Sequence, residues 1–251
     1  MDSYNLQAGG HLPTGYRPGC DLDALSADER EVILAAEPNT MTGLVRLHAL
    51  VIAVRYAIQA DIPGAFAECG VWRGGSVFAI AATLKQLGVT NRDIYLYDTF
   101  DGMTEPTDAD TSFFDGSALE RWNAAVDQGE RMWPQWFSPD VFSETAVRDV
   151  LRASGYPDER LHFIRGRVED TLPEQAPEQL ALLRLDTDWY QSTLHEMVHL
   201  YPRLALGGVL MVDDYGHWEG ARRAVDEYFA DRGETVLLGR VDHTCRQVVK
   251  R

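Results

Sequence analysis

Short apolar runs alternate with stretches of helical periodicity over most of this chain, and the alternation limits the folds that it can adopt. Runs typical of strands cover residues 65–69, 94–97, 161–164, 180–185, 209–212, 236–238 and 245–249. Helical patterns separate most of them, at residues 75–87, 191–201 and 219–230. Strands of this length joined by helices favour an α/β fold with a mainly parallel sheet covered on both faces. Since only a short loop around Asp242 joins the last two runs, the last strand of this seven-stranded sheet should be antiparallel.

Two regions stand outside the alternation. Residues 1–60 begin with a turn-rich stretch of about 40 residues, whose glycines and prolines predict no regular structure of any length. We expect this stretch to wrap the surface or a neighbouring subunit, and a packing helix follows it, with apolar residues recurring from position 44 to position 58. The main domain should then cover residues 61–251. Within it, residues 99–143 form a long aromatic insertion after a strand, which is typical of a lid over a substrate site; a satellite hydrophobic cluster is the alternative.

The chain is acidic, with 39 acidic against 23 basic residues and a formal charge of −16. Such a surface repels phosphate groups, which makes nucleic acids and anionic membranes poor partners. Hydropathy points the same way, because no window approaches the ~18 apolar residues of a transmembrane helix and the N-terminus lacks the zones of a signal peptide. We therefore expect a cytoplasmic protein, whose three cysteines are small buried residues without a disulfide or a structural zinc.

A glycine-rich turn follows the first predicted strand and runs from Glu68 to Ser76. At the carboxyl edge of such a sheet, this turn is the usual place of a nucleotide-like ligand. Gly70 lets the backbone approach a ligand, Ser76 can cap the following helix, and Glu68 suits a ligand that carries an amino group. Asp98 ends the second strand, where a carboxylate can accept hydrogen bonds from ribose hydroxyls. For Glu68 and Asp98, a purely structural role in a turn explains the residue equally well.

Four carboxylates follow the ends of two consecutive predicted strands, Asp186 and Asp188 after one and Asp213 and Asp214 after the next. Because the carboxyl ends of parallel strands meet at one edge of a sheet, these groups should crowd together and raise each other's pKa unless a cation lies among them. Three oxygen ligands suit Mg²⁺, and the lack of a nearby cysteine argues against zinc. The set therefore predicts a Mg²⁺ site, while any one member alone could simply cap a strand or a helix.

Several phrases of the sequence, in order and at consistent spacing, resemble those of the macrocin O-methyltransferase family. They are Ile62-Pro63-Gly64, FAECGVWRGGS at 66–76, DTFDGM at 98–103, RLDTDWYQST at 184–193, VDDY at 212–215 and GARRAVD at 220–226. The resemblance extends from residue 40 to near the C-terminus. It implies the class I fold of S-adenosylmethionine-dependent methyltransferases, which is Rossmann-like and has a seven-stranded, mostly parallel sheet with an antiparallel last strand.

The resemblance also implies cofactors and site residues. S-adenosylmethionine and Mg²⁺ are the expected cofactors, and the matching metal ligands are Asp186, Asp213 and Asp214. Asp188 matches the residue that acts as general base. The expected cofactor-binding residues are Glu68, Gly70, Ser76, Asp98, Val168 and Glu169. The last two follow the third strand, where adenine usually lies in this fold, and packing within the loop explains them equally well.

By the same resemblance, the acceptor is a sugar hydroxyl of a glycosylated natural product in antibiotic biosynthesis, and the protein is a homo-oligomer. A sugar hydroxyl is a poor nucleophile, so the metal would stabilise its deprotonated form and Asp188 would accept the proton. The sulfonium methyl group would lie in line with that oxygen, while the aromatic insertion would keep water out.

Other functions fit parts of the sequence. The same metal site could activate a phenol or a catechol-like acceptor. Residues 195–199 match the HExxH pattern of zinc hydrolases, but they fall on a covering helix. The face of that helix packed on the sheet should hold Leu194, Met197, Val198 and Tyr201, and Glu196 should point away from it with both histidines. A nicotinamide-dependent oxidoreductase could use such a sheet, but the Tyr-x-x-x-Lys pair of its short-chain form is missing. A non-catalytic ligand-binding module is the alternative if the carboxylates bind no metal.

Overall fold

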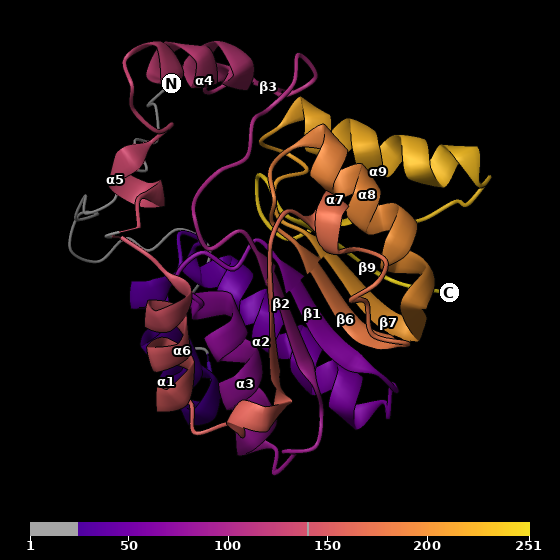
Figure 1. Ribbon diagram of the computed structural model, residues 1–251. Coiled ribbons are helices and arrows are strands. Elements are labelled where there is room, and N and C mark those ends of the chain that lie inside the picture. The colour runs from indigo at the N-terminus through magenta and orange to yellow at the C-terminus, as the bar shows by residue number, and fades with distance from the viewer. Residues whose placement is uncertain (1–24, 140) are drawn as a thin grey trace.

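A seven-stranded sheet runs through the computed structural model, which describes residues 25–139 and 141–251 (Figure 1). The strand order is β5-β2-β1-β6-β7-β9-β8. The strands are β1 (Ala65–Cys69), β2 (Ile94–Asp98), β5 (Leu161–Arg165), β6 (Leu180–Leu185), β7 (Leu204–Val212), β8 (Gly239–Arg240) and β9 (Arg246–Val249). The first five of these pair in parallel, and β9 pairs antiparallel with both β7 and β8. The predicted class I methyltransferase fold, with its reversed last strand, is confirmed.

The strand next to the reversed one lies slightly later in the chain than predicted. We expected residues 236–238 to be paired, but β8 is Gly239–Arg240, which pairs with Gln247 and Arg246. Val236 and Leu238 instead pack their side chains against the core, while Leu237 is 83% exposed. The apolar residues at 236–238 therefore reflect packing against the core and not strand pairing.

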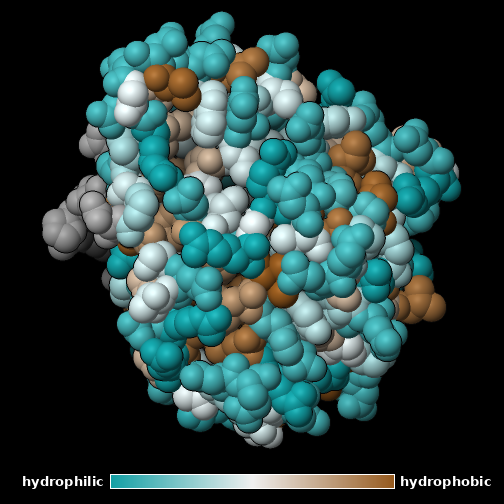
Figure 2. All heavy atoms as spheres, in the orientation of Figure 1, coloured by the Kyte–Doolittle hydropathy of each residue, from teal (hydrophilic) through white to brown (hydrophobic). Residues whose placement is uncertain are grey.

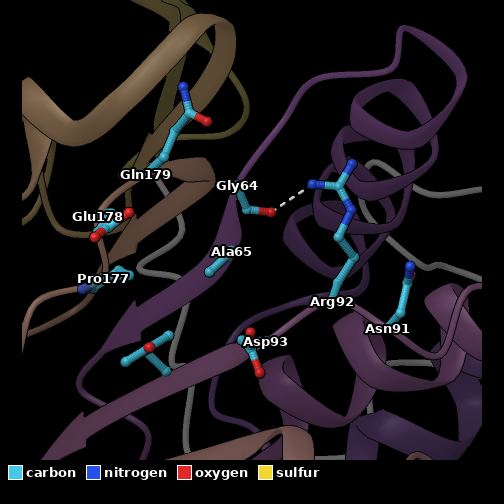
Figure 3. Close-up of a pocket in the computed structure, with 9 residues that line it drawn as sticks. Gly64, Ala65, Asn91, Arg92, Asp93, Pro177, Glu178 and Gln179 are labelled. Atoms are coloured by element: carbon cyan, nitrogen blue, oxygen red, sulfur yellow. Dashed lines mark hydrogen bonds between the residues drawn. The ribbon is translucent and has the colours of Figure 1, made fainter.

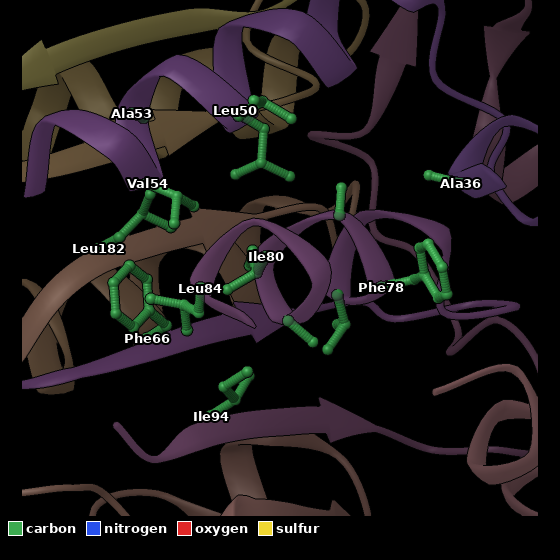
Figure 4. Packing of buried hydrophobic residues seen from close by; sticks show 14 of the residues in the cluster. Ala36, Leu50, Ala53, Val54, Phe66, Phe78, Ile80, Leu84, Ile94 and Leu182 are labelled. Atoms are coloured by element: carbon green, nitrogen blue, oxygen red, sulfur yellow. The ribbon is translucent and has the colours of Figure 1, made fainter. Parts of the chain in front are cut away.

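Two layers of helices cover the sheet. One face is covered by α1 (Ala27–Ala36), α2 (Leu44–Gln59), α3 (Gly75–Gln86) and α6 (Glu144–Ala153). The other is covered by α7 (Val168–Thr171), α8 (Tyr190–His199) and α9 (Glu219–Asp231). Figure 4 shows the first layer from close by, with Phe66, Ile94 and Leu182 of the strands packed against Val54 and Leu84 of the helices. Short 3-10 turns complete the framework at Glu37–Asn39, Asp158–Arg160 and Tyr201–Arg203.

Helix α1 corrects our expectation that the first forty residues lack regular structure. Ser26 caps α1 by accepting a hydrogen bond from the backbone of Glu29, whose carboxylate in turn accepts one from the backbone of Ser26. This capping box is a sequence signal that the surrounding glycines and prolines hid. Ile33 and Ala36 bury the helix in the core next to α3. The expected turn-rich wrap at residues 1–24 lies outside the described residues.

The aromatic insertion, residues 99–143, has some structure of its own. It contains β3 (Thr111–Ser112), β4 (Gly116–Ser117), α4 (Ala118–Asp127) and α5 (Pro134–Phe137). In Figure 1, α4 and α5 stand apart from the sheet. A separate small core joins Ala118 and Met132 of the insertion to Trp189, Trp218 and Ala221 from the loops and helices beyond β6 and β7. The insertion is thus packed onto the protein through aromatic side chains.

The face of the molecule drawn in Figure 2 is mostly hydrophilic, with hydrophobic side chains in small separate groups. Among the described residues, no helix is long and apolar enough to cross a membrane. Cys69 and Cys245 are buried, as expected for cysteines that serve as small core residues.

Candidate active site

Backbone hydrogen bonds beyond the strand ends bring the predicted acidic residues together. The N–H of Asp186 donates to the carbonyl of Cys69 at 2.8 Å, and the N–H of Asp213 donates to the carbonyl of Leu185 at 2.9 Å. Both bonds continue the pairing of β1, β6 and β7 by one residue. The side chains that follow these strands therefore share the carboxyl edge of the sheet, where parallel α/β folds bind ligands.

Three of the four predicted carboxylates form one compact group. Asp186, Asp213 and Asp214 each place one oxygen within 4.8 Å of the others, and no other such group of metal-ligating side chains occurs among the described residues. Asp214 Oδ2 is buried and has no hydrogen-bond partner in the described part of the chain. A buried oxygen without a partner is costly unless a ligand satisfies it. The donor set, all carboxylate oxygens, fits Mg²⁺.

Two arginines, which the sequence analysis did not single out, hold this acidic group. Arg184, at the end of β6, donates to Glu68, to Asp186 at 2.7 Å and to Asp213 at 2.5 Å, with 2% of its side chain exposed. Arg46, on α2, contacts the other oxygen of Asp213 and donates from Nε to Asp242 at 2.7 Å. A charged residue inside the buried strand 180–185 was a readable signal for Arg184, whereas Arg46 lies in an ordinary helical pattern. The expected counter-charge is thus supplied in part by the protein itself.

The two arginines lower the pKa of one of the three carboxylates, whereas the pKa values of the other two are raised. Burial raises the pKa of Asp186 and of Asp214 well above the usual carboxyl range. Burial also acts to raise the pKa of Asp213, but Arg184 and Arg46 outweigh it and hold that pKa below the usual range. Asp213 is therefore the firmly ionised member, and a bound cation would favour the ionised form of the other two.

Asp188 lies beside this group and has a different partner. Its Oδ1 accepts a hydrogen bond of 2.9 Å from the indole Nε1 of Trp218. Its backbone has a φ of 68°, the left-handed region that aspartate tolerates better than most residues. Burial, followed by the charge of Asp186, raises the pKa of Asp188, while the Trp218 hydrogen bond opposes the shift. The predicted base is thus set apart from the three predicted metal ligands.

The turn after β1 is shaped by close contacts within the protein. Gly70 has a φ of 84°, and a Cβ there would overlap the backbone carbonyl of Asp186, so this glycine is required by the approach of β6 as well as by any ligand. The Asp98 carboxylate accepts hydrogen bonds from the backbone N–H groups of Val71 at 2.7 Å, Trp72 at 3.0 Å and Phe100 at 2.7 Å. Asp98 therefore fixes the turn, and its contact with ribose stays a prediction.

Ser76 does not cap α3, contrary to our expectation. The N-cap is Gly74, with a φ of 86°, and Ser76 is the second residue of the helix and is buried. Glu68 is buried too, with Oε1 held by Arg184 and Oε2 without a partner among the described residues. Burial, opposed by Arg184, raises the pKa of Glu68 to about 7.

The predicted adenine contacts open the short helix α7. Val168 is its first residue and is buried. Glu169 is the second, and its Oε2 lies 3.5 Å from Nε of Arg167. The N–H of Gly166 donates to the carbonyl of Asp98 at 3.0 Å, which joins this loop to the end of β2. Val168 and Glu169 therefore follow a strand next to the turn of Asp98, and their contact with adenine stays a prediction.

The HExxH segment has an arrangement unlike that of a zinc hydrolase. Glu196 is fully buried and accepts a hydrogen bond of 2.9 Å from Thr187 Oγ1, so our expectation that it points away from the core was wrong. Val198, expected in the core, is 40% exposed. His195 and His199 are partly exposed, with ring centroids 4.3 Å apart. Because Glu196 is turned inward by Thr187, it is not placed to activate water beside these histidines.

A cleft of about 320 Å³ opens at the opposite end of the strands (Figure 3). Arg92 spans it with hydrogen bonds to the carbonyls of Gly64 at 2.6 Å and Ile62 at 2.7 Å. Asp93, at its edge, lies 2.9 Å from His162 Nε2. These polar groups are satisfied by the protein, and the cleft faces away from the acidic group.

Comparison with known proteins places the chain in a family. The sequence model of the macrocin-O-methyltransferases (TylF) matches residues 24–250. The chain is 35% identical over 190 residues to the mycinamicin III 3''-O-methyltransferase of Micromonospora griseorubida, covering 76% of this chain and 70% of that protein. It is 34% identical over 206 residues to the 8-demethyl-8-(2,3-dimethoxy-alpha-L-rhamnosyl)-tetracenomycin-C 4'-O-methyltransferase of Streptomyces olivaceus, covering 82% and 73%. The solved structure of the O-methyltransferase NovP superposes with a TM-score of 0.71 at 31% identity, over 84% of this chain and 82% of that one. With this fold and this acidic group at the carboxyl edge of the sheet, the chain belongs to the macrocin-O-methyltransferase family and is an O-methyltransferase.

Proposed function

We propose that this enzyme transfers a methyl group from S-adenosylmethionine to a sugar hydroxyl of a glycosylated natural product, with Mg²⁺ held by Asp186, Asp213 and Asp214. The observation that carries the proposal is the convergence of one oxygen from each of these carboxylates within 4.8 Å. The names of two relatives support the acceptor class, since one enzyme acts on the 3''-oxygen of mycinamicin III and the other on a compound with a rhamnosyl group.

The three carboxylates are the ligands in this proposal. When bound, Mg²⁺ supplies Lewis acidity that lowers the pKa of an acceptor hydroxyl. Arg184 orients two of the ligands, because one of its nitrogens binds Asp186 and the other binds Asp213. Asp214 Oδ2, which has no hydrogen-bond partner among the described residues, is available to the ion.

Asp188 is the proposed general base. It neighbours the metal ligands in sequence but is held by a different partner, Trp218, through one carboxylate oxygen. The fixed carboxylate can accept the proton that the acceptor hydroxyl loses. When bound, S-adenosylmethionine would supply the methyl group to that oxygen and leave as S-adenosylhomocysteine.

The glycine turn and the α7 loop are the proposed cofactor site. Glu68 Oε2 has no partner in the part of the chain that the structure describes, and as an acceptor it suits the amino group of the methionyl part of S-adenosylmethionine. Gly70, Ser76 and Asp98 line the same turn, and Val168 and Glu169 are the proposed adenine contacts. The solved structure of the O-methyltransferase TomG in complex with SAM has the same fold at 11% identity, with a TM-score of 0.52, which supports S-adenosylmethionine as the cofactor.

The aromatic insertion is the proposed lid and acceptor surface. Phe113 and Phe114, at the tip of the β3–β4 hairpin, are 95% and 62% exposed. The Phe114 ring stacks on His217 with centroids 5.7 Å apart, and the N–H of His217 donates to the carbonyl of Asp214. Two adjacent exposed aromatic rings near the acidic group suit the apolar aglycone of a glycosylated acceptor.

A methylation screen tests the proposal. The enzyme would be incubated with methyl-labelled S-adenosylmethionine and a panel of glycosylated macrolides, glycosylated polyketides, their aglycones and simple catechols, with Mg²⁺ and with EDTA. We expect label on a glycosylated compound, at a sugar oxygen identified by mass spectrometry, in the presence of Mg²⁺. Label on catechols or aglycones alone would overturn the sugar assignment, and equal labelling in EDTA would overturn the metal assignment.

A further inference from the structure

Trp218 occupies the junction between the aromatic insertion and the acidic group. It is the N-cap residue of α9, and its backbone N–H donates to the carbonyl of Asp214 at 3.0 Å. Its side chain is 2% exposed and belongs to the small core that Met132 and Ala118 of the insertion complete. Trp218 therefore contacts a proposed metal ligand, the insertion and, through its indole, the proposed base.

The indole makes one polar contact, and that contact is with Asp188. A tryptophan side chain has a single N–H donor, and Nε1 of Trp218 donates it to Asp188 Oδ1 at 2.9 Å. If the ring only filled space, a phenylalanine would serve, because the indole N–H needs a buried partner. The choice of tryptophan at this position thus points to the carboxylate that the N–H holds.

The same ring is packed against the insertion and against the residue that follows the base. The Trp218 centroid lies 6.2 Å from that of Trp133, in the insertion, and 5.0 Å from that of Trp189. Trp189 in turn donates its indole N–H to the carbonyl of Thr104, also in the insertion, at 3.0 Å. The loop that carries Asp188 is consequently tied to the insertion by two contacts, one through the Trp218 ring and one through the Trp189 indole.

We infer that Trp218 is a positioning residue, which couples the packing of the aromatic insertion to the orientation of Asp188. The insertion then does more than cover the acceptor, because its aromatic core keeps Trp218 in place and Trp218 keeps one oxygen of Asp188 fixed. Trp133 packs on the Trp218 ring and has no hydrogen bond to Asp188 in the described structure. A substitution at Trp133 should therefore change the orientation of Asp188 through Trp218. The catalytic part of this inference rests on the proposed function, while the coupling itself can be measured without turnover.

The test combines kinetics with nuclear magnetic resonance of ¹⁵N-tryptophan-labelled enzyme. The Trp218 indole signal is assigned by its loss in Trp218→Phe, a variant that removes the N–H and keeps an aromatic ring. We expect Trp218→Phe to lower kcat by about 10-fold or more, as for loss of a hydrogen bond to a charged group, with Mn²⁺ affinity and the KM for S-adenosylmethionine unchanged. Trp133→Leu should lower kcat in the same direction and speed hydrogen exchange of the Trp218 indole by about 10-fold, because local packing protects it.

Matched variants separate coupling from general damage. Trp133→Phe should restore most of both effects, and Leu206→Ala, a change at a 72% exposed residue of β7 outside the insertion, should cause neither. Wild-type kcat in Trp218→Phe, or unchanged exchange of the Trp218 indole in Trp133→Leu, would overturn the inference.

The experiments distinguish an error in the proposed base, Asp188, from an error in the proposed coupling through Trp218. If Asp188→Asn keeps full activity, the general-base role is wrong, and the exchange measurement alone decides whether the insertion and the Asp188 loop are coupled. In that variant the Trp218 indole signal should still move, because a carboxylate acceptor is replaced by a neutral amide. An unmoved signal would show that the hydrogen bond is absent and would overturn the inference on its own.

Discussion

Charged side chains gather at both ends of the sheet, but they are buried at the carboxyl ends of the strands and exposed at the amino ends. At the carboxyl ends, Arg184 and Asp213 have side chains that are 2% and 3% exposed, and they are 2.5 Å apart. At the amino ends, Asp93 and Arg160 have side chains that are 36% and 41% exposed, with 3.4 Å between them. Similar residue types are therefore held in opposite surroundings within one sheet.

This difference in burial agrees with the proposed active site at the carboxyl ends of the strands. Burying ionised groups is costly, so a fold retains them where their charge has a use or where they are fully paired. At the carboxyl ends, Glu68 Oε2 and Asp214 Oδ2 are buried without a partner among the described residues. At the amino ends, Arg92 is satisfied by two backbone carbonyls although it spans the cleft of Figure 3. Of the two ends compared, the one with these buried carboxylate oxygens carries the proposed active site, whereas the cleft lies at the other end.

The largest effect is expected from removing one charge of the acidic group. Asp186→Asn should abolish Mg²⁺-dependent methyl transfer and weaken Mn²⁺ binding, measured by calorimetry, by about 100-fold or more, while S-adenosylmethionine still binds. Asp158→Asn, at a side chain that is 63% exposed, is the matched control and should change neither quantity. Full activity of Asp186→Asn in EDTA would contradict the metal assignment.

The next effect is expected at the proposed base. Asp188→Asn should lower kcat by about 100-fold or more, as loss of a general base typically does, and should leave Mn²⁺ affinity unchanged. Single-turnover rates at saturating cofactor measure the chemical step directly. A loss of metal binding equal to that of Asp186→Asn would instead make Asp188 a fourth ligand, and a wild-type rate would remove it from catalysis.

A smaller effect, on stability, is expected from the arginine that compensates the acidic group. Arg46→Gln leaves Asp213 and Asp242 with one partner fewer in a buried setting, so the free energy of unfolding should fall by about 3 kcal/mol without metal. Mg²⁺ should recover part of this loss, since the ion supplies positive charge to the same carboxylates. Arg92→Gln, at the amino ends, should cost about 1 kcal/mol, equally with and without Mg²⁺. Chemical denaturation measures the free energy of unfolding of both variants. If Mg²⁺ does not change the loss in Arg46→Gln, the idea that Arg46 and the ion compensate the same carboxylates is contradicted.

The sequence predicted the parts of this molecule that depend on local pattern. Alternating apolar runs predicted the sheet and its reversed last strand, because strand and helix periodicities differ. Carboxylates directly after consecutive parallel strands predicted a crowded group of four, because strand ends share an edge, and three of them, Asp186, Asp213 and Asp214, come within 4.8 Å of one another. The second prediction depended on β6 and β7 being both consecutive along the chain and adjacent in the sheet.

Features that depend on distant contacts were missed. Arg46 lies 167 residues from Asp213 in sequence, and nothing local indicates their pairing. Helical periodicity placed Val198 of α8 toward the sheet and Glu196 away from it. In the structure, Glu196 is buried and its carboxylate accepts a hydrogen bond from Thr187. Ser76 was expected to cap α3, but the N-cap is the left-handed Gly74, two residues earlier. Side-chain hydrogen bonds across the fold override patterns that are read along one element.

An effect on acceptor binding is expected at the exposed aromatic pair. Phe114→Ala should raise the KM for a glycosylated acceptor by about 5-fold to 10-fold, because one aromatic contact with the aglycone is lost. The KM for S-adenosylmethionine should not change. A truncated acceptor that keeps the sugar and lacks the aglycone is the control, and the variant should treat it as the wild type does. An equal rise for both acceptors would place Phe114 against the sugar or outside the acceptor site.

The smallest effect is expected from the exposed charges at the amino ends. Burial acts to raise the pKa of Asp93, but His162 and Arg160 outweigh it and lower that pKa below the usual range. A carboxyl group whose pKa is lower in the folded state stabilises the fold above its unfolded pKa, and this contribution is lost as the pH falls through the folded value. Asp93→Asn should therefore reduce the free energy of unfolding by a few tenths of a kcal/mol near pH 7 and by less than that below about pH 4. Its kcat should equal that of the wild type. Loss of activity in this variant would mean that the exposed end of the sheet also serves the reaction, and the contrast between the two ends would then fail.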